Sequence, residues 1–377
     1  MRAQQLTPTA FTVSISHPSE INQEAMMTGG FSDTVKAANN ALSAKKTKTI
    51  GAKPGETPRF EVYHATFSVC SHKVRTVLLE KNIPFVSHTM NLAVSASRGS
   101  DTYHPDYVRL RLLGAPGAKM VGTYTGQSSV TSEGFDPCVV PTLVDHLHQR
   151  VVIDSSNICD YLDRETDPQD ALVPIDMADA VAAQIALIDH APHVAVLYGA
   201  HPDEEDKRPD IIADRIKGVH DHKVKHLEAL KASVADQPDL VAAYDAKIAK
   251  ELSAKGFVYD RDRMLDAHAR MVQHVAALET QLGSHGGKWT MGDDYTMADI
   301  MWTISLFRLK WLGLGTLWEN SDSSPNVARY VGYAFERPGF KAAVVDWPMS
   351  TPPSQHIPGT DGFAKKIGFV WQAIRLG

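Results

Sequence analysis

The stretch FEVYHATFSVCSHKVR, residues 60–75, joins an alternating apolar pattern to a helical one. Its first part predicts a short strand, because Phe60 and Val62 fall on the same face. A loop follows, and after it apolar residues recur at the spacing of one helix face: Val74, Val77 and Leu78. Cys70 therefore lies where the strand has ended and the helix begins. A thiol at that position is suited to be a nucleophile, a redox centre or a small core residue.

The same two patterns continue along the chain. PFVSHTMNL at 84–92 predicts a second strand, and VVPTLVDH at 139–146 and RVVIDS at 150–155 predict two more around a turn. A helical spacing follows in SSNICDYLDRE. Residues 93–137 are dominated by Gly, Ser, Tyr and Arg, with YVRLRL as the candidate regular piece, and we interpret them as an insertion. Residues 59–166 then have the order β-α-β, insertion, β-β-α.

The two ends and the second half of the chain have other patterns. Residues 1–58 are rich in Thr, Ser, Ala and Lys without sustained periodicity, so we expect a disordered or loosely docked tail. Helical spacing dominates residues 177–345 and predicts an all-helical domain. Within it, MADIMWTISLFRLKWLGLG predicts a buried helix that begins with a capping box at Thr296 and Asp299. Residues 346–377 form a C-terminal extension.

Composition excludes several classes of function. The chain has 377 residues and a formal net charge of −6, which does not indicate a nucleic-acid partner. Pro, Gly and charged residues interrupt the apolar runs, so no membrane partner is expected. Three cysteines are too few for a disulfide scaffold and indicate a reducing compartment, so we expect a cytoplasmic protein. No nucleotide motif is present, and no cluster completes the histidine pairs at 146–148 and 220–222, so neither a nucleotide nor a metal is expected.

Two short motifs within this order of elements indicate groups that could bind a ligand. Pro141 opens a strand, a position that accommodates proline. With the order of elements, this is typical of a thioredoxin-like fold, in which the proline is cis and the backbone of the preceding residue, here Val140, is exposed to a thiol substrate. Asp154 and Ser155 begin the next helix, where free N–H groups and a hydroxyl favour a carboxylate. From these two residues alone, a plain helix N-cap is the simpler interpretation.

Together these motifs resemble the glutathione transferase superfamily over about residues 60–345. The features that carry the resemblance are the SxC pattern in the first turn, VPTL, the acidic residue–Ser pair, and a helical half containing YTMADI. SVCSHKVR is similar to the zeta-type branch and to the glutathione-dependent reductive dehalogenases of chlorinated hydroquinones. The dehalogenases are also similar in YVRLRL, TGQSSVTSEGFDPCVVPTLVDH, APHVAVLYGAHPD and SLFRLKWLG. The resemblance implies an α/β, thioredoxin-like N-terminal domain followed by an all-α C-terminal domain.

The resemblance also implies how glutathione binds. Its cysteinyl backbone would pair with Val140 beside cis-Pro141. Its γ-glutamyl carboxylate would lie at Asp154 and Ser155, with the acidic side chain taking the amino group. Ser68 corresponds to the serine that helps to hold the glutathione thiolate.

Cys70 corresponds to the catalytic cysteine of these dehalogenases. The position supports this role, because the dipole and free N–H groups at a helix N-terminus stabilise a thiolate. Lys73 and Arg75, one turn further on, would add positive charge. Cys138 and Cys159 lie outside the motif, and we interpret them as packing residues.

The implied reaction consumes two glutathione molecules as reductant and needs neither metal nor flavin. The aromatic substrate would lie between the domains, near Phe67, His190, His193 and Tyr198. Alternatives are a conjugating transferase, an enzyme that cleaves thioethers or ethers of another aromatic substrate, a zeta-like isomerase and a non-catalytic glutathione-fold module. Since members of the superfamily usually dimerise, the resemblance also implies a homodimer.

Overall fold

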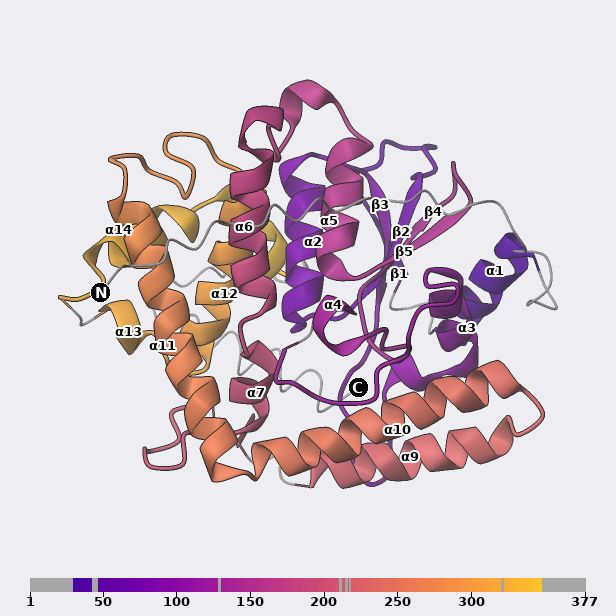
Figure 1. Ribbon diagram of the computed structural model, residues 1–377. Coiled ribbons are helices and arrows are strands. Elements are labelled where there is room, and N and C mark those ends of the chain that lie inside the picture. Colours follow the sequence, from indigo (N-terminus) through magenta and orange to yellow (C-terminus); the bar gives the residue numbers. More distant parts are fainter. Residues whose placement is uncertain are drawn as a thin grey trace, which may run out of the picture.

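The computed structural model describes residues 30–42, 47–127, 130–209, 212–213, 216, 218–319 and 322–347. Two regions are evident in Figure 1: a small sheet with its own helices, and a larger helical region beside and beneath it. The predicted combination of a thioredoxin-like domain and a helical domain is confirmed.

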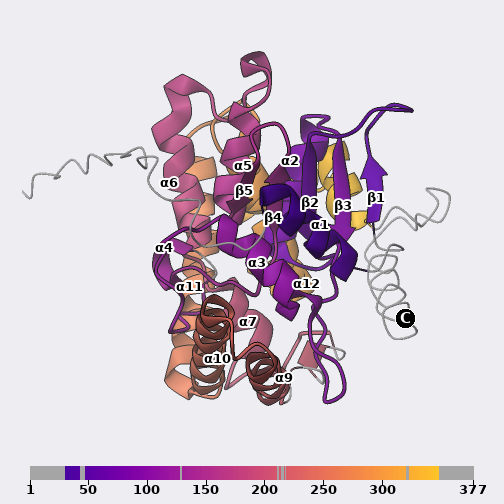
Figure 2. The ribbon, with the colours of Figure 1, turned by 90° about the vertical axis from the view of Figure 1, so that its right-hand side faces the viewer.

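The sheet has five strands among the described residues, in the order β1-β3-β2-β4-β5. The strands are β1 (Thr47–Ile50), β2 (Phe60–His64), β3 (Phe85–Thr89), β4 (Thr142–Asp145) and β5 (Arg150–Ile153). Only β2 and β3 pair in parallel, and the other neighbours are antiparallel. Figure 2 shows the strands side by side, with β1 at one edge.

Helices cover both faces of this sheet (Figure 1). On one face lie α2 (Val69–Glu80) and α5 (Ser155–Arg164), and on the other lie α1 (Phe31–Ala41) and α3 (Pro105–Leu113). Successive strand residues point to opposite faces, so Val62 is buried in the core that contains α2 and α5, whereas Tyr63 is buried in the core that contains α1 and α3. With apolar side chains buried on both faces, β2 lies between the two cores at the centre of the sheet. The loop that leads into α2 begins at its end.

The expectation of a disordered or loosely docked tail is wrong for part of residues 1–58. Phe31–Ala41 forms α1, which packs on α3, and Thr47–Ile50 pairs with β3 as an edge strand. The strand is mostly exposed and carries no alternating apolar pattern, and α1 buries only small side chains, Thr34, Val35 and Ala38. Residues 1–29 lie outside the described residues.

The predicted insertion contains more regular structure than expected. YVRLRL lies in α3, as predicted, and short helices add to it: η2 (Asp101–Tyr103) and α4 (Val130–Glu133). Its apolar residues pack against a long helical hairpin formed by α9 (Val219–Ser233) and α10 (Pro238–Val258). This hairpin lies beneath the sheet domain in Figure 1. The insertion therefore joins the two halves of the molecule.

The helical half is organised around α12 (Met297–Trp311), in which every residue except Lys310 is buried. Its predicted capping box is confirmed. The side chain of Thr296 bonds the backbone of Asp299, and the side chain of Asp299 bonds the backbone of Thr296. The remaining elements are η3 (Pro168–Asp170), η4 (Ile175–Met177), α6 (Ala178–Asp189), α7 (His193–Tyr198), α11 (Arg261–Gly283), α13 (Thr316–Glu319), α14 (Pro325–Ala334), α15 (Pro338–Phe340) and the π-helical η5 (Lys341–Val345).

The segment Ile175–Tyr198 is long and apolar enough, by length and composition, to cross a membrane, contrary to the expectation from the sequence. It is interrupted, since α6 ends at Asp189 and α7 begins at His193. Val181 and Ile188 are buried in the main core, and Asp189 forms an ion pair with Lys73 of α2 at 2.8 Å. We therefore interpret the segment as two packed helices of the folded domain.

Candidate functional site

A cavity of about 260 Å³ is lined by the loop before α2, the insertion, the start of α5 and several helices of the helical half. All of the predicted site residues except His190 line it: Phe67, Ser68, Cys70, Val140, Pro141, Asp154, Ser155, His193 and Tyr198. His190, the C-cap of α6, is not among the residues that line the cavity, and its Nδ1 lies 2.6 Å from the carbonyl of Ala186. Its placement near the substrate stays a prediction.

The N-terminus of α2 positions the predicted thiol. Ser68 is the N-cap, and its hydroxyl accepts a hydrogen bond from the backbone N–H of Ser71 at 3.2 Å. Cys70 is the second residue of the helix and is partly exposed. Cys138 and Cys159 are buried, and burial raises the pKa of both thiols. Cys70 and Cys138 both line the cavity, and of the two Cys70 is the one that is partly exposed.

Another part of the lining is the turn before β4, where the peptide bond between Val140 and Pro141 is cis, as predicted. Arg111 of α3 fixes this turn, because its guanidinium donates to the carbonyl of Pro141 at 2.8 Å and to the carbonyl of Asp136 at 3.0 Å. Tyr107, one turn earlier on α3, donates to the carbonyl of Val139 at 2.7 Å. The insertion therefore shapes the wall that would receive a thiol substrate.

Asp154 caps α5 and also lines the cavity. Its backbone has a φ of 68°, and one carboxylate oxygen accepts from the N–H of Ser156 at 3.0 Å and of Asn157 at 3.5 Å. The other oxygen accepts from the N–H of Val130 at 3.2 Å. Asp154 is therefore the N-cap that the simpler interpretation expected, and with Ser155 it also presents polar groups to the cavity.

Of the two cations expected beside Cys70, only Lys73 lies close to the site. Its ammonium forms an ion pair with Asp189 at 2.8 Å, and although burial lowers the pKa of Lys73, the charge of Asp189 raises it above the ordinary value. Arg75 is turned away from the cavity, because its guanidinium donates to the carbonyl of Ala343 at 2.9 Å and lies over the ring of Trp347. The expectation for Arg75 is wrong.

The helical half contributes charges that the sequence did not identify. Lys223 of α9 and Lys247 of α10 lie 3.0 Å from the carboxylate of Glu251, and Lys247 lies 2.8 Å from Asp136 of the insertion. Lys250 lies 2.7 Å from Glu133. We name these six residues the ionic wall: Glu133, Asp136, Lys223, Lys247, Lys250 and Glu251. All six line the cavity.

His220 supports this wall from within the fold. The residue is buried, and its Nδ1 lies 2.8 Å from Glu251. On the neighbouring helix α7, the hydroxyl of Tyr198 lies 3.1 Å from the ammonium of Lys223. The ion pairs that join the insertion to α10 link residues more than 100 positions apart in the chain, which is why no local motif reveals them.

A further basic residue, Arg308 of α12, lines the cavity near the start of α2. It is buried, donates to the carbonyl of Phe67 and lies over the ring of Trp311 at 4.9 Å. Trp311 also stacks with Phe67, with ring centroids 6.2 Å apart. Arg308 lies within SLFRLKWLG, but only the fold brings it to the loop that carries Cys70.

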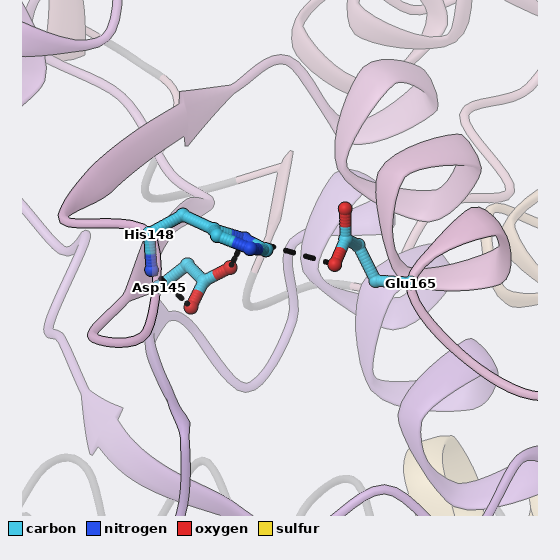
Figure 3. A group of neighbouring side chains, drawn as sticks. All are labelled: Asp145, His148 and Glu165. Atoms are coloured by element: carbon cyan, nitrogen blue, oxygen red, sulfur yellow. Dashed lines mark hydrogen bonds and ion pairs between the residues drawn. The ribbon is translucent and has the colours of Figure 1, made fainter.

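Asp145, His148 and Glu165 are close enough to resemble a metal site (Figure 3). Their spacing has another cause, because one nitrogen of Arg59 lies between them, at 2.5 Å from Asp145, 2.6 Å from Glu165 and 2.9 Å from His148. These ion pairs raise the pKa of Arg59 above its ordinary value. The group is an ion-pair network around a guanidinium, and it lies outside the cavity.

Comparison with known proteins agrees with this geometry. Residues 67–165 match the family model described as "Glutathione S-transferase, N-terminal domain". The chain is 42% identical over 302 residues to the 2,5-dichlorohydroquinone reductive dechlorinase of Sphingobium indicum, a match that covers 80% of this chain and 86% of the relative. It is 24% identical to the tetrachloro-p-hydroquinone reductive dehalogenase of Sphingobium chlorophenolicum, over 76% of this chain and 96% of that protein.

Among solved structures, a beta-etherase from Sphingobium sp. strain SYK-6 aligns with a TM-score of 0.47 and 15% identity, over 76% of this chain and 98% of that one. Glutathione S-transferase III in its apo form aligns with the same TM-score and 18% identity, over 79% of this chain and all of that one.

Proposed function

The chain belongs to the glutathione transferase superfamily, on the branch of the 2,5-dichlorohydroquinone reductive dechlorinases, and we propose that it removes chlorine from chlorinated hydroquinones with glutathione as the reductant. The observation that carries the proposal is the position of Cys70. It is a partly exposed thiol at a helix N-terminus, and it shares one cavity with the cis-Pro141 turn and with Asp154 and Ser155. A transferase that only activates glutathione has no need of a second thiol there.

In this proposal glutathione lies across the wall formed by α2, the Pro141 turn and α5. Its cysteinyl backbone pairs with Val140, and its γ-glutamyl group binds at Asp154 and Ser155. Ser68 donates to the glutathione sulfur. The contact in the structure supports this role, because the Ser68 oxygen accepts from the N–H of Ser71 while its own O–H stays available as a donor.

The reaction begins when the thiolate of the first glutathione adds to the chlorinated ring in its keto form. A carbon–sulfur bond forms, chloride leaves, and the product is a glutathionyl hydroquinone. The thiolate of Cys70 then attacks the sulfur of this thioether. A sulfur–sulfur bond forms, the carbon–sulfur electron pair stays with the ring, and a ring C–H replaces the former C–Cl.

A second glutathione thiolate resolves the mixed disulfide on Cys70 by thiol–disulfide exchange. Overall, one aryl chloride and two glutathiones give one aryl C–H, chloride, a proton and glutathione disulfide. Both electrons come from the two thiols, so the sequence of steps is balanced without a further reductant.

The test is mass spectrometry of the products from 2,5-dichlorohydroquinone and excess glutathione. We expect wild type to give chlorohydroquinone and glutathione disulfide, and Cys70→Ser to stop at the glutathionyl conjugate. Cys159→Ala, which removes a buried thiol outside the cavity, is the matched control and should behave as wild type. If wild type and Cys70→Ser give the same conjugate and no reduced product, the protein is a conjugating transferase and the proposal fails.

A further inference from the structure

Arg308 has a position unlike that of the other cations in the cavity. Only 5% of the residue is exposed, and the ring of Trp311 supports one face of its guanidinium. One nitrogen donates to the carbonyl of Phe67, three residues before Cys70 in the chain. A guanidinium has five N–H donors. One carbonyl therefore uses only a small part of its capacity, and the cavity lies beside it.

The other charged side chains that line the cavity have several described polar partners each, whereas Arg308 has one described hydrogen bond. In the ionic wall, three lysines face three carboxylates, and each lysine lies within 3.0 Å of at least one of them. Lys73 is paired with Asp189. Arg111, the other arginine of the lining, is committed to the two carbonyls and the hydroxyl of Thr142. No described carboxylate lies within ion-pair distance of Arg308.

The groups around Arg308 leave its guanidinium positively charged and leave His72 and His193 neutral at neutral pH. Burial lowers the pKa of Arg308 to about 10, and the charges of Cys70 and Tyr198 oppose this shift, so the guanidinium remains protonated at neutral pH. Burial and nearby cations, Arg308 among them, hold the pKa of His72 and of His193 well below the ordinary value, so both imidazoles are neutral. A buried cation without a carboxylate is a receptor for an anion.

We propose that Arg308 binds the oxyanion of the substrate ring and thereby selects aromatic rings that carry an ionisable hydroxyl beside the carbon that reacts. This inference rests on the proposed function. When Cys70 attacks the thioether sulfur of the keto tautomer, the carbon–sulfur electron pair moves into the ring, and the neighbouring carbonyl oxygen becomes a phenolate. The ring hydrogen is already on that carbon, so no further proton is needed. A fixed guanidinium stabilises charge that develops at this oxygen.

The test measures binding without turnover. Protein saturated with S-methylglutathione is titrated with 2,5-dichlorophenol and with its methyl ether, 2,5-dichloroanisole, at a pH well below the pKa of the phenol. We expect wild type to bind the phenol at least tenfold more tightly than the ether, and to show the ultraviolet difference band of a phenolate. Arg308→Gln should lose both the band and the preference, whereas Arg308→Lys should retain part of each.

Arg270→Gln is the matched control. Arg270 also donates to a backbone carbonyl, that of His190 at 2.8 Å, but it lies outside the cavity, so this variant should bind like wild type. A folded Arg308→Gln protein that keeps the phenolate band would overturn the inference. Equal affinity of wild type for phenol and ether would overturn it without any variant. Since neither measurement needs turnover, a failed dechlorination assay leaves this result intact, and the reverse also holds.

Discussion

Replacing Glu251 by Gln should destabilise the protein more than any other single change in the ionic wall. Glu251 is 4% exposed, and its carboxylate lies 3.0 Å from Lys223 and from Lys247 and 2.8 Å from Nδ1 of His220. Lys247 keeps Asp136 as a partner, but Lys223 loses its only described carboxylate. Leaving one buried cation uncompensated lowers the free energy of unfolding by about 3–5 kcal/mol.

Asp136→Asn is the comparison that isolates this cause. Both lysines beside Asp136 retain another carboxylate, Lys247 that of Glu251 and Lys250 that of Glu133. We therefore expect the free energy of unfolding to fall by only about 1–3 kcal/mol. Adding Lys223→Met to Glu251→Gln removes the stranded charge and should recover part of the loss.

The assay is urea denaturation followed by circular dichroism, repeated over a range of pH. Burial raises the pKa of Glu251, but the charges of Lys223 and Lys247 outweigh burial and hold it well below the ordinary value. A carboxyl group with a lowered pKa stabilises the fold above its unfolded pKa, about 4.3 for Glu. The difference between wild type and Glu251→Gln should therefore be constant near neutral pH and shrink below about pH 4. A Glu251→Gln protein as stable as wild type, or no recovery in the double variant, refutes the reasoning.

Three further predictions concern other ionic groups. Arg59→Gln should lower the unfolding midpoint, because it leaves the buried carboxylate of Asp145 without its cation. EDTA should leave the wild-type midpoint unchanged; a shift with EDTA that depends on Asp145 would instead indicate a metal. Asp299→Ala removes the capping-box carboxylate and should lower the free energy of unfolding by about 1–3 kcal/mol in urea denaturation, a loss that Asp299→Asn should only partly reproduce. Asp136→Asn should leave the ionic wall with a net positive charge and bind 2,5-dichlorophenol up to about tenfold more tightly by the same titration; weaker binding would contradict the charge balance of the wall.

The core of the fold follows from local patterns. Strand alternation and helical spacing predicted β2, α2, β3, β4, β5 and α5 in order, and the capping box located the start of α12. The edge strand β1 was missed because an exposed strand that gains stability from pairing with β3 needs no apolar alternation. For the same reason α1, which buries few and small side chains, has no strong signal in the sequence.

The site was predictable where one short motif contains it. Ser68, Cys70, Pro141 and Asp154 each lie at the start of an element, and the boundaries of those elements can be found from the sequence. Arg75 shows where spacing alone fails. Arg75 comes five residues after Cys70, which on a helix of 3.6 residues per turn places it about 140° around the axis. Its side chain therefore points into the core and not toward the thiol.

The two kinds of charge in the cavity have different consequences for chemistry. The ionic wall is neutral as a unit, so its fields largely cancel beyond its own contacts, and its effect is to hold the insertion against α10. Arg308 has no such compensation among the described residues, so its field extends into the space beside Cys70. Paired charges can therefore shape this cavity without attracting an anion, while a guanidinium with N–H groups left over can bind one. The position of Arg308, on the loop side of the cavity, places that anion next to the thiol.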